Sequence, residues 1–214
     1  VEKKTLTVSG FNYSPLTKEY DETTDAPSGF AVTATSGSGL LSGDSVTISF
    51  TEAAYNNANV NQANKITVTG MTISGANAND YQLSSASYEK TGASITKTSA
   101  TNSVRITGTN TYGQTLTANV STNSDGTKHF QWWYATSSSA TSGTEISGAT
   151  SATYTIGNGL ADKYIGVTVT IDAGTNWNAA SAATDITDAS TNTTEKVEKK
   201  TLTVSGFNYS PLTK

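Results

Sequence analysis

Short stretches in which apolar and polar residues alternate run through the whole chain. Leu6 and Val8 alternate with threonine and serine, and Val46, Ile48 and Phe50 recur at every second position. A period of two places apolar side chains on one face of a β-strand and polar side chains on the other. Further stretches of this kind lie at 30–35, 65–73, 93–97, 104–108, 115–120, 130–134, 146–156 and 160–170. Gly- and Pro-containing segments separate them and predict turns, so the pattern predicts an all-β protein.

The first eighteen residues are repeated near the other end of the sequence. Val1–Lys18 returns without a change as Val197–Lys214, an offset of 196 residues. Solenoids and propellers have much shorter periods, so each copy is expected to hold whole domains with their own cores. The sequence therefore predicts one complete copy (1–196) and the first strand of a further repeat (197–214). That strand is expected to pair with an exposed sheet edge or to swap into a neighbouring molecule.

Composition narrows the class of protein. Cysteine is absent, which excludes disulfides, cysteine-bound zinc and thiol chemistry. The net charge is −4 and Lys3 and Lys4 follow a glutamate, so no cationic face for nucleic acid is expected. The sequence has no run of 18 apolar residues, so no membrane insertion is expected within this segment. A cysteine-free, acidic, Thr- and Asn-rich repeat favours an extracellular protein of the bacterial cell surface.

Five segments of the N-terminal half carry a family resemblance: KTLTVSG at 4–10, KEYDETT at 18–24, LSGDSV at 41–46, KITVTGMTIS at 65–74 and NDYQL at 79–83. In this order they resemble the YDG-type repeat of bacterial surface adhesins. The resemblance implies an all-β extracellular module over 1–97, with Tyr20 and Asp21 as structural residues and no catalytic residues. Glu22 stands where the family commonly has glycine, so a different turn is expected there.

The C-terminal half, 98–196, resembles bacterial immunoglobulin-like modules through the segments at 113–118, 130–133, 146–156 and 162–170. The resemblance implies a β-sandwich with Trp132 as the core tryptophan of the third strand. Asp162 and Tyr164 resemble the corner before the penultimate strand, where the tyrosine hydroxyl binds backbone. Gly166 then takes the place of the antibody cysteine. The two halves together predict two β-sandwich-type domains in tandem, with an elongated arrangement.

One acidic cluster and one histidine are candidates for ion binding or chemistry. Asp21, Glu22 and Asp25 are the densest group of carboxylates, and calcium is the ion that such oxygens bind. The spacing does not match an EF-hand loop, and the alternative is a solvated turn in which Asp21 accepts backbone N–H groups. His129 lacks nearby partners in the sequence and is expected to be solvated. No other cofactor is expected.

Two tryptophans are candidates for binding a sugar by stacking. Trp133 lies on the strand face opposite Trp132, and Trp177 lies in a loop. The alternative, which we favour, is that Trp133 packs under a loop or against the neighbouring domain. Since no catalytic constellation is present, the sequence predicts a non-enzymatic spacer of a surface adhesin whose partners are neighbouring repeats, each copy adding roughly 70–90 Å of reach. The alternative function is weak, multivalent binding of a host glycan or protein.

Overall fold

The computed structural model describes residues 1–11, 16–33, 39–187, 196–203 and 205. Regular structure in this part is almost entirely β-strand, and its one helical segment is the 3-10 turn η2 (Ala78–Asp80). The predicted all-β fold class is therefore confirmed. None of the described segments is a helix with the length and hydrophobicity of a membrane span.

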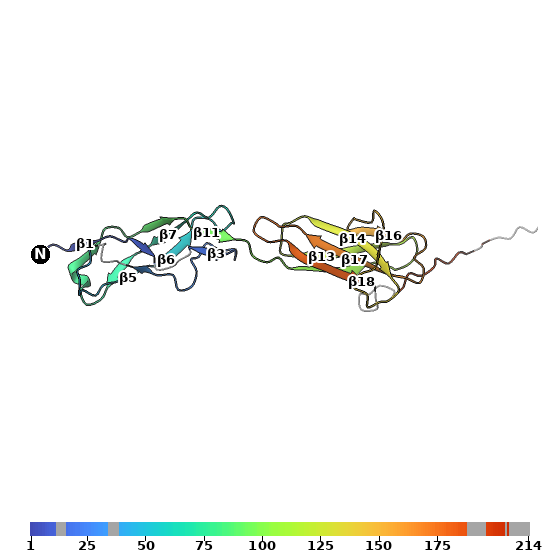
Figure 1. The fold of residues 1–214 in the computed structure, drawn as a ribbon, viewed down its shortest axis with the longest axis horizontal. Helices are drawn as coiled ribbons and strands as arrows, with labels where there is room; N and C mark the ends of the chain where they lie inside the picture. Colours follow the sequence, from blue (N-terminus) through green and yellow to red (C-terminus); the bar gives the residue numbers. More distant parts are fainter. Residues whose placement is uncertain (12–15, 34–38, 188–195, 204, 206–214) are drawn as a thin grey trace, which may run out of the picture. The chain divides into compact units, whose positions relative to one another are not determined.

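The chain forms two compact units (Figure 1). Unit 1 consists of Val1–Ser99 together with Ala173–Asn178, and unit 2 consists of Ala100–Asp172 and the residues from Ala179 onward. Each unit has its own apolar core.

Unit 1 is built from short strands. They are β1 (Lys4–Leu6), β2 (Gly10–Phe11), β3 (Thr17–Glu19), β4 (Val32–Thr33), β5 (Thr47–Ser49), β6 (Glu52–Tyr55), β7 (Lys65–Thr69), β8 (Thr72–Ser74), β9 (Tyr81–Leu83), β10 (Tyr88–Thr91) and β11 (Ser94–Thr96). The strands β10, β7 and β6 form an antiparallel sheet, and β2 with β4 and β5 with β8 form antiparallel pairs. The pairs β1 with β9 and β3 with β11 are parallel.

The core of unit 1 follows the alternation of its strands. In β7, Ile66 and Val68 are fully buried between partly exposed Lys65, Thr67 and Thr69. The buried residues of this core are Val8, Leu16, Val32, Ile48, Tyr55, Val60, Ala63, Ile66, Val68, Met71, Ala93 and Ile95. Several of them lie in loops, so the core depends on irregular segments as well as on strands.

Six residues from much later in the sequence complete unit 1. The side-chain oxygen of buried Asn176 accepts a hydrogen bond from the backbone N–H of Val60 at 2.9 Å. Its side-chain nitrogen donates to Oδ1 of Asn59 at 2.9 Å. Backbone bonds run from Thr98 N to Asn176 O and from Asn178 N to Thr98 O. The loop that ends in the buried Val60 is thus held by a side chain more than 100 residues away.

Unit 2 has longer strands arranged in two sheets. They are β12 (Asn102–Thr107), β13 (Thr115–Thr122), β14 (Lys128–Ala135), β15 (Thr144–Glu145), β16 (Thr153–Thr155), β17 (Tyr164–Ile171) and β18 (Ala180–Ile186). One sheet has the order β12-β13-β16 and the other the order β15-β14-β17-β18, both antiparallel.

Both sheets of unit 2 contribute to a single core. Ile106 and Leu116 from the first sheet and Trp132 and Val167 from the second are fully buried in the same cluster. In β17 the residues at 165, 167, 169 and 171 are buried apolar residues, as a strand with a two-residue period requires. Two sheets that share one core form a β-sandwich.

Candidate functional site

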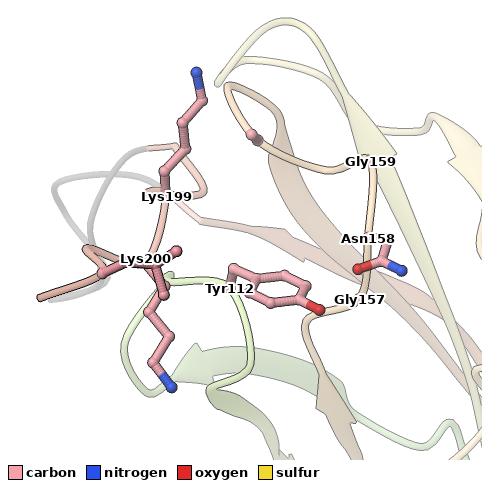
Figure 2. A pocket seen from close by; sticks show the side chains of 8 residues that line it. Tyr112, Gly157, Asn158, Gly159, Lys199 and Lys200 are labelled. Atoms are coloured by element: carbon pink, nitrogen blue, oxygen red, sulfur yellow. The ribbon is translucent and has the colours of Figure 1, made fainter. Parts of the chain in front are cut away.

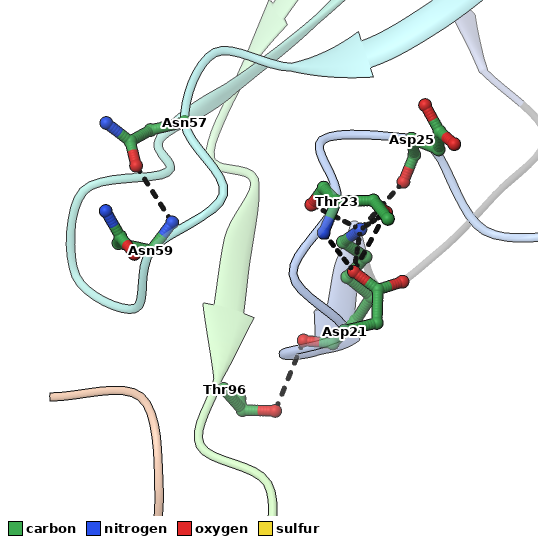
Figure 3. Close-up of polar contacts among 7 residues, drawn as sticks. Asp21, Thr23, Asp25, Asn57, Asn59 and Thr96 are labelled. Carbon is green, nitrogen blue, oxygen red and sulfur yellow. Dashed lines mark hydrogen bonds and ion pairs between the residues drawn. The ribbon is translucent and has the colours of Figure 1, made fainter. Parts of the chain in front are cut away.

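The ammonium of Lys18 in β3 is bound by several oxygen atoms of the turn that follows it. Figure 3 shows the turn residues Asp21, Thr23 and Asp25. The Lys18 nitrogen lies 2.7 Å from Oδ1 of Asp21, 2.9 Å from the carbonyl oxygen of Thr23 and 3.0 Å from its hydroxyl, and 3.0 Å from the carbonyl oxygen of Asp25. It also lies 5.4 Å from the centre of the Tyr55 ring. The side chain of Lys18 is only 7% exposed. We call this arrangement the Lys18 clamp.

Strand pairing positions the lysine of the Lys18 clamp, and a turn positions the oxygen atoms that it binds. Lys18 is held by β11, which pairs with β3 so that Lys18 lies beside Ile95. The opposing oxygens come from the turn at 21–25, where Oδ1 of Asp21 accepts hydrogen bonds from the backbone N–H and the hydroxyl of Thr23. An aspartate that binds a backbone N–H two residues on forms an Asx-turn. The KEYDETT segment therefore folds back so that its lysine binds its own turn.

The Lys18 clamp lowers the pKa of Asp21. Burial raises the pKa of this carboxyl, but the hydrogen bonds from Lys18 and Thr23 outweigh that effect, so the pKa lies below its usual value. The folded protein therefore favours the charged carboxylate, and the ion pair with Lys18 is strongest when Asp21 is ionised.

The three carboxylates predicted as calcium candidates do not meet at one point. Asp21 binds Lys18, Asp25 contributes its backbone carbonyl, and Figure 3 shows the Asp25 carboxylate pointing away from the clamp. Glu22 is exposed. Among the residues described here, no group of three or more His, Cys, Asp or Glu residues is arranged to hold a metal ion. The ammonium of Lys18 occupies the centre of the oxygen atoms that a cation would need.

Tyr20 and Trp177 contact each other within unit 1. Their ring centres lie 5.0 Å apart at an interplanar angle of 74°, an edge-to-face pair. Trp177 also forms a parallel bridge with Thr98. Trp177 is half-buried, so one edge of its ring is committed to packing.

The two neighbouring tryptophans of β14 face opposite sides of their sheet. Trp132 lies in the core with its Nε1 donating to the carbonyl oxygen of Ser151 at 2.8 Å. Trp133 is 3% exposed and donates from Nε1 to the hydroxyl of Thr168. A Cβ atom added at Gly166 would lie 2.3 Å from the Trp133 ring, and one at Gly143 would lie 2.7 Å from it. Both glycines therefore let the backbone approach this indole, which is not open to a sugar.

The expected tyrosine corner of unit 2 has a different form. Tyr164 is buried on the outer face of β17 with Trp133 and Ile186, and none of the described residues accepts a hydrogen bond from its hydroxyl. Gly166 shares that face, so it does not occupy a core-facing cysteine position. The reason is the register of β17, in which Ile165 and Val167 face the core. Asp162 has a φ of 62° and donates its N–H to the carbonyl oxygen of Val197.

His129 has an acidic partner that sequence spacing did not reveal. Its Nε2 lies 2.9 Å from Oδ2 of Asp172, and both side chains are largely exposed. The antiparallel register of β14 and β17 pairs Lys128 with Ile171 and so brings the two segments together. An exposed pair of this kind contributes little to stability.

A hollow of about 310 Å³ lies on unit 2 between Tyr112, the loop at 157–161 and the segment at 199–202. Figure 2 shows the Tyr112 ring between Lys200 and the loop that carries Gly157 and Asn158. The side chains of Lys199 and Lys200 point away from each other, and Leu202 completes the lining. Tyr112 and Leu202 are exposed apolar side chains, so this face is uncovered in the described structure.

Two features of these sites were not predicted from the sequence. Sequence patterns identify Lys18 only as part of the segment KEYDETT, although a lysine within a strand and three residues before an aspartate is a usable signal. Asn176 gave no signal, because its partners Asn59 and Val60 are more than 100 residues away.

Comparison with known proteins gives one match. The family model of the YDG domain matches residues 2–89, which supports the resemblance drawn for the N-terminal half. The matched range contains the Lys18 clamp and ends within β10. No curated protein and no solved structure is significantly similar to the chain.

Proposed function

We propose that the chain is a spacer segment of a bacterial cell-surface adhesin, made of tandem copies that hold a terminal binding region away from the cell. The observation that carries the proposal is the identical 18-residue stretch at 1–18 and 197–214, which encloses two units with separate cores. A chain that repeats whole domains adds length with each copy. The YDG domain match over 2–89 supports the first unit's place in this class of surface protein.

The proposed immunoglobulin-like character of unit 2 is supported by its strand order. Seven strands form sheets of three and four, and the core tryptophan Trp132 lies on the third strand. These are features of immunoglobulin-type sandwiches. Such domains serve as rigid modules in many extracellular proteins, and an array of them on the bacterial surface has neighbouring repeats as its first partners.

The rival proposal is that each copy binds a host glycan or protein weakly and that the array gains avidity. The sequence gives Trp133 and Trp177 as its candidate side chains, and the burial of the Trp133 indole beside Gly143 and Gly166 counts against this proposal. Trp177 has one ring edge packed on Tyr20. The spacer is therefore the function that the arrangement of the aromatic residues supports better.

Small-angle X-ray scattering on chains of one, two and three complete copies tests the spacer. We expect the maximum dimension to increase by the same increment, roughly 70–90 Å, with each added copy. A maximum dimension that stops increasing at the second copy contradicts the proposal.

A glycan array and surface-binding assays with the same chains test the rival. Binding that rises steeply with copy number and disappears in Trp177→Ala supports direct adhesion. The matched control is Trp133→Phe, which changes a buried indole without altering the exposed surface.

A further inference from the structure

The first two residues of the second copy are built into unit 2. Val197 is 2% exposed and belongs to the same core cluster as Trp132 and Leu160. Its N–H donates to the carbonyl oxygen of Lys163 at 2.8 Å, and its carbonyl accepts the N–H of Asp162 at 3.1 Å. The pair Val197–Glu198 is therefore part of unit 2, although it is also the start of the repeated sequence.

Glu198 is also bound through its backbone, by the segment at 110–112. Its N–H donates to the carbonyl oxygen of Asn110 at 2.8 Å, and its carbonyl accepts the N–H of Tyr112 at 3.0 Å, which makes a parallel bridge with Thr111. Asn110 is fully buried and its side chain donates to the hydroxyl of Thr187. We call the groups that bind Val197 and Glu198, at 110–112 and 160–163, the junction seat.

The identical pair Val1–Glu2 has no such seat in the described structure. Both residues are exposed and lie outside any strand. The strand β1 then begins at Lys4, and its Leu6 is fully buried in unit 1. The equivalent of Leu6 is Leu202, which is exposed beside Tyr112. In the copy at 197–202 the first two residues are bound in unit 2, whereas in the copy at 1–6 the sixth residue is buried in unit 1.

The linker between the bound pair Val197–Glu198 and the first strand of the following copy is short. Lys200–Leu202 corresponds to β1, and Glu198 is already bound in the junction seat, so Lys199 is the one residue between them. Burial of Leu202 in the core of a following unit 1 places that unit next to the hollow lined by Tyr112 and Asn158.

The hollow lined by Tyr112 and Asn158 is called the Tyr112 face. We propose that the junction seat and the Tyr112 face are the contact surface between consecutive copies. The Val-Glu pair that opens each copy closes unit 2 of the copy before it, and the Tyr112 face receives unit 1 of the same following copy. The partner is therefore a second copy of this chain. The inference rests on the proposed tandem array and adds to it a specific surface.

The junction seat is tested by one substitution made at two identical residues. Val197→Ser places a hydroxyl in an apolar core and is expected to lower the melting temperature of unit 2 by roughly 5–15 °C. Val1→Ser, the matched control, changes an exposed residue and is expected to leave both units unchanged. Peptide-resolved hydrogen exchange assigns the melting to each unit. Equal melting temperatures of unit 2 in the two variants would overturn the proposed role of Val197 in the junction seat.

The Tyr112 face is tested by hydroxyl-radical labelling of chains with one and two copies. One of the two Tyr112 side chains is then covered, so labelling per copy is expected to fall about twofold. Labelling of His129 is the control and is expected to stay constant. Unchanged Tyr112 labelling overturns the contact surface, while scattering that still grows by a fixed increment leaves the spacer proposal standing, so the two failures are distinguishable.

Discussion

Unit 1 and unit 2 are both all-β, but they are stabilised in different ways. The principal strands of unit 2 have six to eight residues and enclose one core. The strands of unit 1 have two to five residues, and polar side chains bind the backbone of its loops. Asn56 accepts hydrogen bonds from two backbone N–H groups, Asn77 from one and Asn176 from one, while Lys18 donates to two carbonyls.

The difference indicates which changes each unit tolerates. Long paired strands satisfy many of their backbone groups among themselves, and side chains such as Asn102 and Gln131 bind further carbonyls in unit 2. Because its long strands enclose one core, unit 2 should be most sensitive to lost core volume. Short strands leave many backbone groups to the loops, and a buried polar group without a partner is costly. Unit 1 should therefore be most sensitive to the loss of single polar side chains.

The largest expected effect is removal of the core tryptophan of unit 2. Trp132→Ala deletes a fully buried indole and its hydrogen bond to Ser151, which should lower the free energy of unfolding of unit 2 by about 3–5 kcal/mol. Urea titration followed by peptide-resolved hydrogen exchange measures each unit separately. Unit 1 is the internal control, and a simultaneous loss of both units would contradict the separation of their cores.

The next effect should come from the Lys18 clamp in unit 1. Lys18→Met keeps the length of the side chain but removes the ammonium that binds Asp21 and the carbonyl oxygens of Thr23 and Asp25, which should cost about 2–4 kcal/mol of unfolding free energy. The measurement is the same urea titration, read from peptides of unit 1.

Lys65→Met is the matched control for the Lys18 clamp. Lys65 pairs with Glu89 at 2.9 Å, but both side chains are well exposed, so its loss should cost less than about 1 kcal/mol. Similar losses of unfolding free energy in Lys18→Met and Lys65→Met would show that burial of the Lys18 ammonium does not strengthen its contribution to stability.

A smaller effect is expected from acid. The hydrogen bonds that hold the pKa of Asp21 below its usual value outweigh burial, and those from Lys65 and Thr67 lower the pKa of Glu89. A lowered pKa in the folded state stabilises the fold above the unfolded pKa, and the stabilisation is lost as the pH falls through the folded pKa. Unit 1 should therefore lose stability below about pH 4.

Asp21→Asn isolates the contribution of the clamp to this pH dependence. The variant should be less stable than the parent at pH 7 and should show a flatter decline in acid, measured by thermal melting between neutral and low pH. Asp172→Asn, which removes the exposed partner of His129 in unit 2, is the control and should leave the profile of unit 1 unchanged. A parallel decline in the parent and Asp21→Asn would contradict the assignment.

The strands of both units could be predicted from the sequence, but the contacts between loops could not. Alternation in 160–170 predicts the strand that the structure places at Tyr164–Ile171, and Trp132 lies in the core as expected. Gly166 does not take the core-facing place expected of it, because a resemblance does not fix strand register within one residue. The Lys18 clamp and the Asn176 contacts depend on how loops meet in three dimensions, and alternation carries no information about that. Of the stretch 197–214, which was predicted to pair with a sheet edge, Glu198 forms a bridge with Thr111 in unit 2. Residues 204 and 206–214 lie outside the described residues, so their pairing stays a prediction.

The smallest expected effect concerns the turn at Glu22. Glu22 has a φ of 69°, a left-handed conformation that glycine adopts without strain. Glu22→Gly should therefore stabilise unit 1 by about 0.5–1 kcal/mol, because relief of strain exceeds the added entropy of the unfolded chain. Asn61→Gly is the control: Asn61 has a φ of 61° in the same unit, but asparagine tolerates that conformation, so its replacement should change little. Equal gains, measured by urea titration, would mean that backbone strain at Glu22 is not what distinguishes this turn.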